Sequence, residues 1–320
     1  MTAGGPPKAA AAPERAEPSR WQPIACLLGA VAIFGLQPLA MKVVLGFFSP
    51  TFAAFARFFA AASLFGAIAA WSRRNAGPAS AVPRAALWLT LGGVSFGLAN
   101  ISWNASLTYT TVGASSVLQL INPVILALWG IWFLAEGCGP LRAAGLVLAL
   151  SSMFAISWNG QDLSALTGTR YFRGNMLALA SGLGNCLCAM GQKVTVRGRP
   201  AVLVVAPMFA ISAATCGLAA LPAAALVAPF SPAVFALMVV TGLVGLGLGN
   251  LLFAHSMRTI PASIGAAALT ASSMVSLVSA AVLLREPTTL YLLLGAPLTC
   301  GGVALAVLSG PTRGRPGARG

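Results

Sequence analysis

The strongly polar side chains within the apolar runs of this sequence are mostly amides. Asn100 and Asn250 each follow a glycine-rich apolar run, and they lie 150 positions apart. An amide inside an apolar helix is costly unless something hydrogen-bonds to it. The matched pair therefore predicts a polar site between two halves of the chain that binds a solute by hydrogen bonds. The alternative is a bond between neighbouring helices, a contact that contributes about 0.6–2 kcal/mol.

Two further side chains share a helix face with Asn100. Trp103 and Asn104 follow it by three and four positions, which is one turn of a helix. An aromatic plate beside amides would suit an amino acid or another flat polar solute. The alternative for Trp103 is a place in the belt of aromatic residues at the membrane surface.

A second pair of amides is expected on a helix that a proline interrupts. Gln119 and Asn122 share a face, and Pro123 frees a backbone carbonyl one turn earlier. Amides and freed carbonyls together predict a polar lining, with Asn185 as a weaker candidate of the same type. The alternative for Asn122 is that its amide only satisfies the local break.

Basic residues provide a different chemistry. Arg57 suits bidentate capture of a carboxylate or phosphate, and Lys42 could share in such a patch. The alternatives are a structural ion pair of Arg57 with Glu286, and a Lys42 that reaches out to the membrane surface. Glu136 and Glu286 each follow an apolar run, where a carboxylate is expected to bind loop N–H groups or a basic neighbour. No acidic residue falls in the middle of an apolar run, so no proton-coupling carboxylate is predicted.

The composition indicates which environment surrounds these residues. Of 320 residues, 58% are hydrophobic and 8% charged, whereas soluble domains carry about 25% charged residues. The outer surface must therefore face a lipid bilayer. The net charge of +14 is spread over short basic clusters between apolar runs. This is typical of cytoplasmic loops and argues against nucleic-acid binding.

Several other functions lack the residues that they need. There is no phosphate-binding loop of the form GxxxxGK[ST], and Asp162 is the sole aspartate. Metal-diphosphate chemistry and zinc binding both require more ligands than this. The six cysteines mostly lie in apolar runs and are interpreted as packing residues. The sequence therefore predicts no enzyme, no cofactor and no metal site.

The apolar runs predict an all-α integral membrane protein with ten transmembrane helices. A helix needs about 20 apolar residues to cross a bilayer. The runs long enough for this lie at 23–46, 50–71, 85–105, 110–134, 141–158, 174–192, 201–227, 233–254, 260–284 and 289–309.

The runs divide into two repeats with five spans each. The first repeat is expected at 21–158 and the second at 171–310, flanked by a disordered tail at 1–20 and a basic tail at 311–320. The basic clusters place both tails in the cytoplasm, with the protein in the cell (inner) membrane. Because five is odd, the second repeat must be inverted relative to the first, which is a common plan of transporters.

In this order and spacing, the motifs resemble the EamA-type transporters of the drug/metabolite transporter superfamily. Tyr109–Ser116, followed by Asn122-Pro123 and Glu136, is similar to the fourth-helix signature of that family, and Met257–Ser263 resembles the ninth-helix segment. Arg57 falls where the family carries an arginine early in its second helix. One departure is that Ala271-Ser272-Ser273 replaces the proline expected midway along the ninth helix, which argues against a helix break there.

The resemblance implies a secondary transporter of small metabolites, often an exporter of amino acids. It also implies a central cavity lined mainly by the first, third, fourth, sixth, eighth and ninth helices. We therefore expect alternating access around a central cavity, a small-molecule substrate, and a monomer or homodimer. A channel-like facilitator or a lipid scramblase on the same scaffold is the alternative.

Overall fold

The structure is a computed structural model that describes residues 21–74, 85–133, 138–160, 169–195, 201–222, 224–256 and 262–309. The predicted tails, Glu136 and residues 257–261 lie outside this range. The described elements are helical, apart from an isolated bridge between Phe48 and Leu226. They are α1 (Trp21–Val44), α2 (Pro50–Arg74), α3 (Ala85–Tyr109), α4 (Val112–Leu118), α5 (Ile121–Phe133), α6 (Pro140–Trp158), α7 (Arg170–Thr195), α8 (Ala201–Ala220), α9 (Pro232–Val240), the π-helix η2 (Thr241–Leu248), α10 (Gly249–Ser256), α11 (Ala262–Leu283) and α12 (Leu290–Leu308).

Most of these helices can cross a membrane. Eight stretches of the described residues are long and apolar enough to do so, when α4 with α5, and α9 with η2 and α10, each count as one stretch. The chain is therefore a multi-pass membrane protein. Two predicted spans fall outside this set: α7 carries Arg170, Arg173 and several amides, and the apolar part of α11 is the shorter run Ala268–Leu283.

The fourth predicted span is broken where its proline lies. α4 ends at Leu118 and α5 begins at Ile121, just before Pro123. A proline has no N–H to donate, and its ring clashes with the carbonyl of Gln119 in an unbroken helix. The chain turns instead through bonds from Leu120 N–H to Val117 O (3.0 Å) and from Asn122 N–H to Gln119 O (3.1 Å). By contrast α11, which has no such proline, is continuous from Ala262 to Leu283.

The eighth span is irregular for a different reason. Its middle, η2, is a π-helix with glycines at 242, 245 and 247. A Cβ on Gly242 would lie 2.6 Å from the backbone oxygen of Arg57, so only glycine permits this approach of η2 to α2. π-helical turns are often found at functional sites. The matching glycine-rich run at 92–98 remains α-helical within α3.

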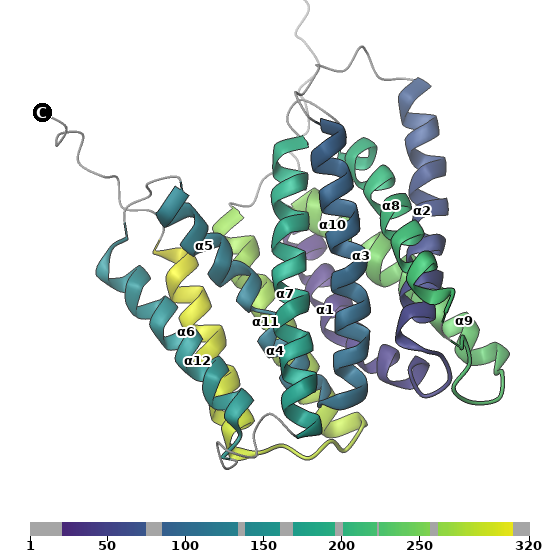
Figure 1. Ribbon diagram of the computed structural model, residues 1–320. Helices are drawn as coiled ribbons and strands as arrows, with labels where there is room; N and C mark the ends of the chain where they lie inside the picture. The colour runs from purple at the N-terminus through teal and green to yellow at the C-terminus, as the bar shows by residue number, and fades with distance from the viewer. Residues whose placement is uncertain are drawn as a thin grey trace, which may run out of the picture.

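The last helices of the two predicted repeats, α6 and α12, pack side by side (Figure 1). A Cβ on Gly145 would lie 2.6 Å from Gly302 O, and one on Gly295 would lie 2.6 Å from the Ile156 side chain. Later residues of α6 thus contact earlier residues of α12, so the two helices run antiparallel. The same reversal relates α2 to α8 and α4 to α11, where the contacting pairs are Phe55–Gly217, Phe65–Phe209, Gly113–Leu277 and Ser116–Ser273.

The remaining helices contact one another in a matching way. α3 packs on α7 and α8, whereas α9, η2 and α10, which follow α3 by about the same 150-residue offset, pack on α1 and α2. One apolar core lies where α4, α5, α6, α11 and α12 meet, and another lies between α2, α8 and η2. The helices thus form one interlocked bundle in which each half contacts the other.

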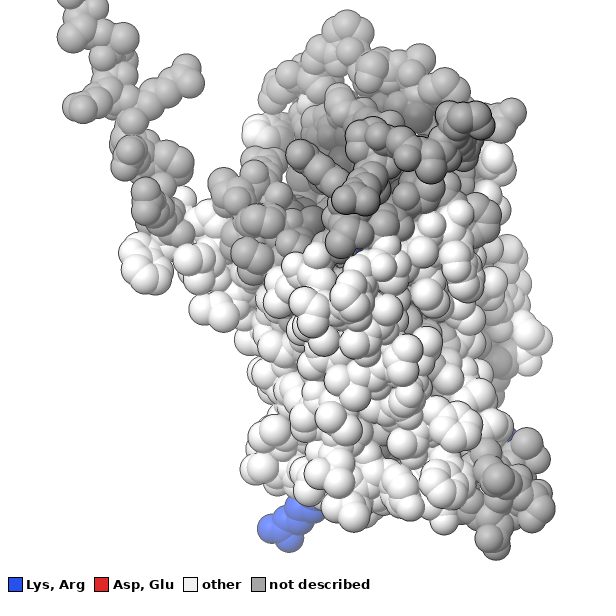
Figure 2. Space-filling view, turned by 90° about the vertical axis from the view of Figure 1, so that its left-hand side faces the viewer, with Lys and Arg blue, Asp and Glu red and all other residues white. Residues whose placement is uncertain are grey.

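The outer surface is apolar. Figure 2 shows the face on which α5, α6 and α12 lie, and its described part is almost entirely free of charged side chains, with basic atoms visible chiefly at the lower edge. Large apolar side chains such as Val147, Phe154, Leu293 and Leu298 are exposed there. This is the surface expected against lipid.

Candidate functional site

The matched amides of the repeat make the same local bond in both halves. Asn100 Nδ2 donates to Phe96 O (3.2 Å), and Asn250 Nδ2 donates to Leu246 O (2.7 Å). Each amide thus bonds to its own helix rather than to a neighbouring helix. Asn100 is buried and Asn250 half-buried. A role of the two in solute binding remains a prediction.

The other two residues on this face of α3 are also buried. Asn104 Nδ2 donates to Pro50 O (2.9 Å), so this amide ties α3 to the start of α2. Trp103 is 7% exposed and packs in a core with residues of α1, α2, α9 and α11. Its burial does not fit the alternative of a belt residue at the membrane surface. The side-chain oxygen of Asn104 and Nε1 of Trp103 are buried without a hydrogen-bond partner.

Arg57 lies on α2 with its side chain directed toward α3. It is 0% exposed, and its Cζ lies 5.4 Å from the centre of the Trp103 ring. Its three side-chain nitrogens have no hydrogen-bond partner among the described residues. The alternative ion pair with Glu286 is not formed, because Glu286 pairs with Lys42 instead.

The amides at the break between α4 and α5 come together with one on α7. Asn185 Nδ2 donates to Gln119 Oε1 (3.3 Å). Gly182 allows this approach, since a Cβ there would lie 3.2 Å from Gln119 O and 3.6 Å from Asn122 N. The side-chain oxygens of Asn122 and Asn185 are buried without a partner among the described residues. The Gln119–Asn185 bond thus joins the first half of the chain to the second, and Asn122 follows Gln119 by three residues. We call these three predicted site residues the amide cluster.

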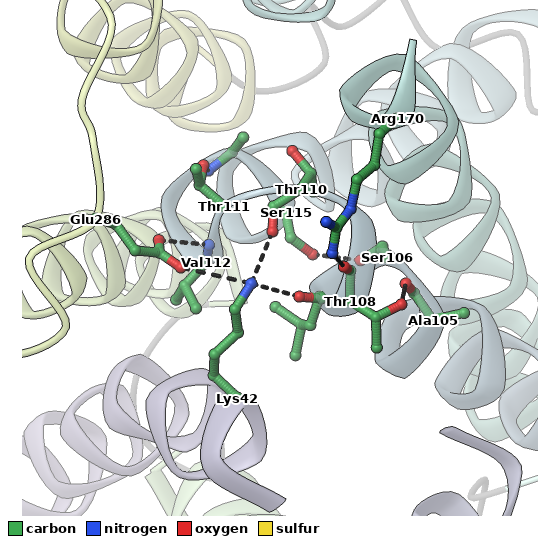
Figure 3. A network of polar contacts seen from close by, with 12 residues as sticks. Lys42, Ala105, Ser106, Thr108, Thr110, Thr111, Val112, Ser115, Arg170 and Glu286 are labelled. Atoms are coloured by element: carbon green, nitrogen blue, oxygen red, sulfur yellow. Dashed lines mark hydrogen bonds and ion pairs between the residues drawn. The ribbon is translucent and has the colours of Figure 1, made fainter. Parts of the chain in front are cut away.

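A network around Lys42 and Glu286 gathers several helix ends (Figure 3). Lys42 Nζ donates to Leu107 O (2.5 Å) and Thr110 O (3.0 Å), and lies 3.6 Å from a carboxylate oxygen of Glu286. The other carboxylate oxygen of Glu286 accepts from Val112 N–H (2.8 Å), at the first turn of α4. We call these five residues the Lys42–Glu286 network. Glu286 was expected to bind loop N–H groups or a basic neighbour. It binds the basic neighbour Lys42, and the N–H group that it accepts from belongs to the start of α4.

Neighbouring contacts bring α7 to the same place. Arg170 donates to Thr108 O, and Thr110 Oγ1 donates to Asn175 Oδ1 (2.7 Å). The network and these neighbouring contacts together connect α1, α3, α4, α7 and the segment after α11. No role was assigned to Thr110 or Asn175 from the sequence. Thr111, next to Thr110, caps α4.

A metal site has no ligands in the part of the chain that the structure describes. No three histidine, cysteine or acidic side chains lie together there. The chemistry available at the predicted site residues is hydrogen bonding by amides, the buried guanidinium of Arg57 and the aromatic ring of Trp103. Groups of these kinds can bind a polar solute.

Comparison with known proteins identifies the family of the chain. The model of the EamA-like transporter family matches residues 21–158 and 172–308. A solved structure described only as a crystal structure of a protein superposes on 91% of this chain and 99% of its own, with a TM-score of 0.61 and 19% sequence identity. At that identity the likeness shows the fold alone. No curated protein matches the chain in sequence.

Proposed function

Because the chain belongs to the EamA-like transporter family of the drug/metabolite transporter superfamily, we propose that it exports small polar metabolites, such as amino acids, by alternating access. The protein lies in the cell membrane with both termini in the cytoplasm. The observation that carries this proposal is the bond between Gln119 and Asn185, which joins the two halves next to buried side-chain oxygens that have no partner among the described residues.

The proposed architecture has ten transmembrane helices in two inverted repeats. α7 and α11 complete the set, because each is a continuous helix of 22 residues or more at a predicted span. The antiparallel packing of α2 on α8, α4 on α11 and α6 on α12 supports the inversion. In an inverted repeat, each half can adopt the conformation of the other half. The bundle can therefore open toward either side of the membrane with equivalent contacts.

The proposed site lies beside the break between α4 and α5. There the side-chain oxygens of Asn122 and Asn185 are buried and have no hydrogen-bond partner among the described residues. Irregular backbone inside a membrane protein is tolerated where it is buried in protein or lines a cavity. A solute with hydrogen-bond donors would satisfy these acceptors. Asn100, Trp103, Asn104 and Asn250, on α3 and α10, complete the proposed lining.

The Lys42–Glu286 network is the proposed outer closure. It joins the ends of α1, α3 and α4 with the segment after α11, at the end predicted to face outward. Release of a solute to the outside requires these ends to separate. The ion pair is partly exposed, so it is weak enough to open and close.

Flux measurements in vesicles test this function. The purified chain is reconstituted into proteoliposomes, and exchange of radiolabelled L-amino acids is measured against concentration. We expect saturable flux that unlabelled solute competes, and a fall of about 10-fold or more in Asn185→Ala, because a buried acceptor for the solute is lost. Gln192→Ala, another amide on α7, is the matched control and keeps the flux.

Other outcomes would assign the alternative functions. Flux that rises linearly with concentration would identify a channel-like facilitator. Movement of fluorescent lipid between leaflets, without flux of soluble metabolites, would identify a scramblase. Either result overturns the carrier mechanism.

A further inference from the structure

The surroundings of Arg57 indicate which class of solute the protein transports. We propose that the transported solute carries a single carboxylate, and that Arg57 and Trp103 bind this group. The inference rests on the proposed transport function, and goes beyond it by assigning the charge of the solute and the side chains that recognise it.

The side chain of Arg57 lacks a hydrogen-bond acceptor among the described residues. Its side chain is 0% exposed, and Nε, Nη1 and Nη2 are all unbonded among the described residues. A guanidinium stays protonated in proteins and offers five N–H donors. A buried charge is strongly unfavourable unless it is paired and hydrogen-bonded. The site therefore needs an acceptor, preferably an anion.

The described part of the chain supplies no anion that could pair with Arg57. Glu286 is the sole acidic residue within the described ranges. Its carboxylate is occupied by Lys42 on one oxygen and by Val112 N–H on the other. Arg57 is thus left with the ring of Trp103, whose centre lies 5.4 Å from Cζ. A cation above an aromatic face is stabilised, but its N–H groups stay free for a ligand.

Trp103, whose ring lies next to Arg57, also carries an unbonded hydrogen-bond donor among the described residues. Nε1 of Trp103 is buried without a partner, and an indole can only donate. The ring holds this nitrogen beside the guanidinium. Two unsatisfied donor groups at one place match an oxyanion, and a planar carboxylate fits the fork of an arginine with two parallel bonds.

The surroundings of Arg57 also indicate how much negative charge the bound group carries. Lys42, the other basic side chain near this end of α2, is neutralised by Glu286. Arg57 therefore offers a single positive charge in apolar surroundings. One carboxylate group balances the guanidinium that it contacts, whereas a phosphate monoester group carries about −1.5 to −2 at neutral pH and would leave an excess of buried negative charge beside Arg57.

A free acceptor lies one residue further along α3. The side-chain oxygen of Asn104 is buried without a partner, while its nitrogen is occupied by Pro50 O. This oxygen can accept from a donor on the solute, such as an ammonium or hydroxyl group close to the carboxylate. Amino acids and hydroxy acids have this combination.

Pairs of solutes that differ only in the carboxylate test the inference. The purified chain is titrated with L-phenylalanine and L-glutamine, and each is compared with the derivative in which an amide replaces the α-carboxylate. Inorganic phosphate is titrated in the same way, and the rise in Tm is recorded. We expect each carboxylate to stabilise the protein at a concentration at least about 10-fold below that of its amide. Phosphate is expected to stabilise least.

Three variants locate the site. Arg57→Gln should remove the difference between carboxylate and amide, and Arg57→Lys should reduce it, because a lysine keeps the charge but loses the fork. Trp103→Phe keeps the ring and removes Nε1, so it should weaken the carboxylate about 5-fold to 10-fold. If Arg57→Gln does not fold, Arg57→Lys and Trp103→Phe carry the test.

The outcomes separate this inference from the proposed function. Saturable flux in proteoliposomes with equal preference for acids and amides would overturn the carboxylate site and leave the transporter intact. Stabilisation by phosphate equal to that by carboxylates would overturn the single-charge argument. Absence of saturable flux for every solute would overturn the proposed function itself.

Discussion

Two basic side chains near the connection between α1 and α2 have different partners. Lys42 has an acidic partner and two backbone carbonyls, whereas Arg57 has an aromatic ring and no acceptor among the described residues. The difference follows from position, because Lys42 lies in the last turn of α1, where helix ends meet, and Arg57 lies about two turns into α2. The charged end of Lys42 is therefore held by the helix ends around it, whereas the N–H groups of Arg57 have no acceptor among the described residues.

A double-mutant cycle tests the structural role at the scale of single residues. Lys42→Met and Glu286→Gln should each lower the free energy of unfolding, since each removes one partner of an ion pair with further hydrogen bonds. Their combined effect should fall short of the sum by about 0.5–3 kcal/mol. Unfolding by denaturant in detergent, followed by tryptophan fluorescence, measures the coupling.

The control is Arg285→Gln, which removes an exposed charge next to Glu286. Its effect and that of Lys42→Met should add within about 0.5 kcal/mol. Additive effects of Lys42→Met and Glu286→Gln would show that the network does not couple the two helix ends.

The amide cluster shows what the sequence could predict at this scale. The three-residue spacing of Gln119 and Asn122 predicted a shared site, because such spacing puts both side chains on one helix face. The contact of Asn185 with Gln119 could not be predicted, since it depends on where α7 packs. The alternative that paired Arg57 with Glu286 is not observed, since Glu286 pairs with Lys42.

Helices of this chain approach one another closely where glycines face a neighbour. At the contact of α6 with α12, a Cβ on Gly302 would lie 2.6 Å from Ala149 N and 2.7 Å from Gly145 O. A Cβ on the adjacent Gly301 would meet nothing within 4 Å, so this glycine faces away from the bundle. Small residues in membrane helices permit such packing, which contributes to association in lipid.

This pair of neighbouring glycines gives a matched prediction for the element. Gly302→Ala should destabilise the protein by about 1–3 kcal/mol, because the two backbones must separate. Gly301→Ala should be neutral or slightly stabilising, since alanine favours a helix. Tm in detergent measures both. Equal effects would contradict the close contact of α6 with α12.

The two irregular spans differ in how far the sequence specified them. Pro123 made a break between α4 and α5 plausible, because it removes a helical hydrogen bond. The proline alone did not determine the break, since Pro38, Pro207 and Pro297 lie inside the continuous helices α1, α8 and α12. The π-helix η2 could not be predicted, since the similar glycine-rich run in α3 stays α-helical. The difference arises from packing, as Gly242 lies against the backbone of Arg57.

At the scale of the whole molecule, the composition already required a lipid-facing surface, and the structure shows it. The 150-residue offset in the sequence suggested that the two repeats pack together. The antiparallel contacts between their helices could be identified only from the structure. These contacts support the proposed alternating access, in which the two halves move relative to each other about the site between them.

The predicted orientation can be measured directly. Cys138 is exposed just before α6, and Thr288 is exposed in the segment before α12. A membrane-impermeant maleimide should label Thr288→Cys in a Cys138→Ser background from outside intact cells. It should reach Cys138 of the natural chain only after permeabilisation. The reverse pattern would place both termini outside.

The central claim is that the outer end must open for each solute to leave. Lys42→Cys with Glu286→Cys, in the Cys138→Ser background, places two thiols across this end, and a cleavable bifunctional thiol reagent can join them. The account predicts that joining abolishes saturable exchange in proteoliposomes, that cleaving the reagent restores it, and that each single-cysteine variant is unaffected by the reagent. Saturable exchange that continues while the two thiols are joined would contradict it.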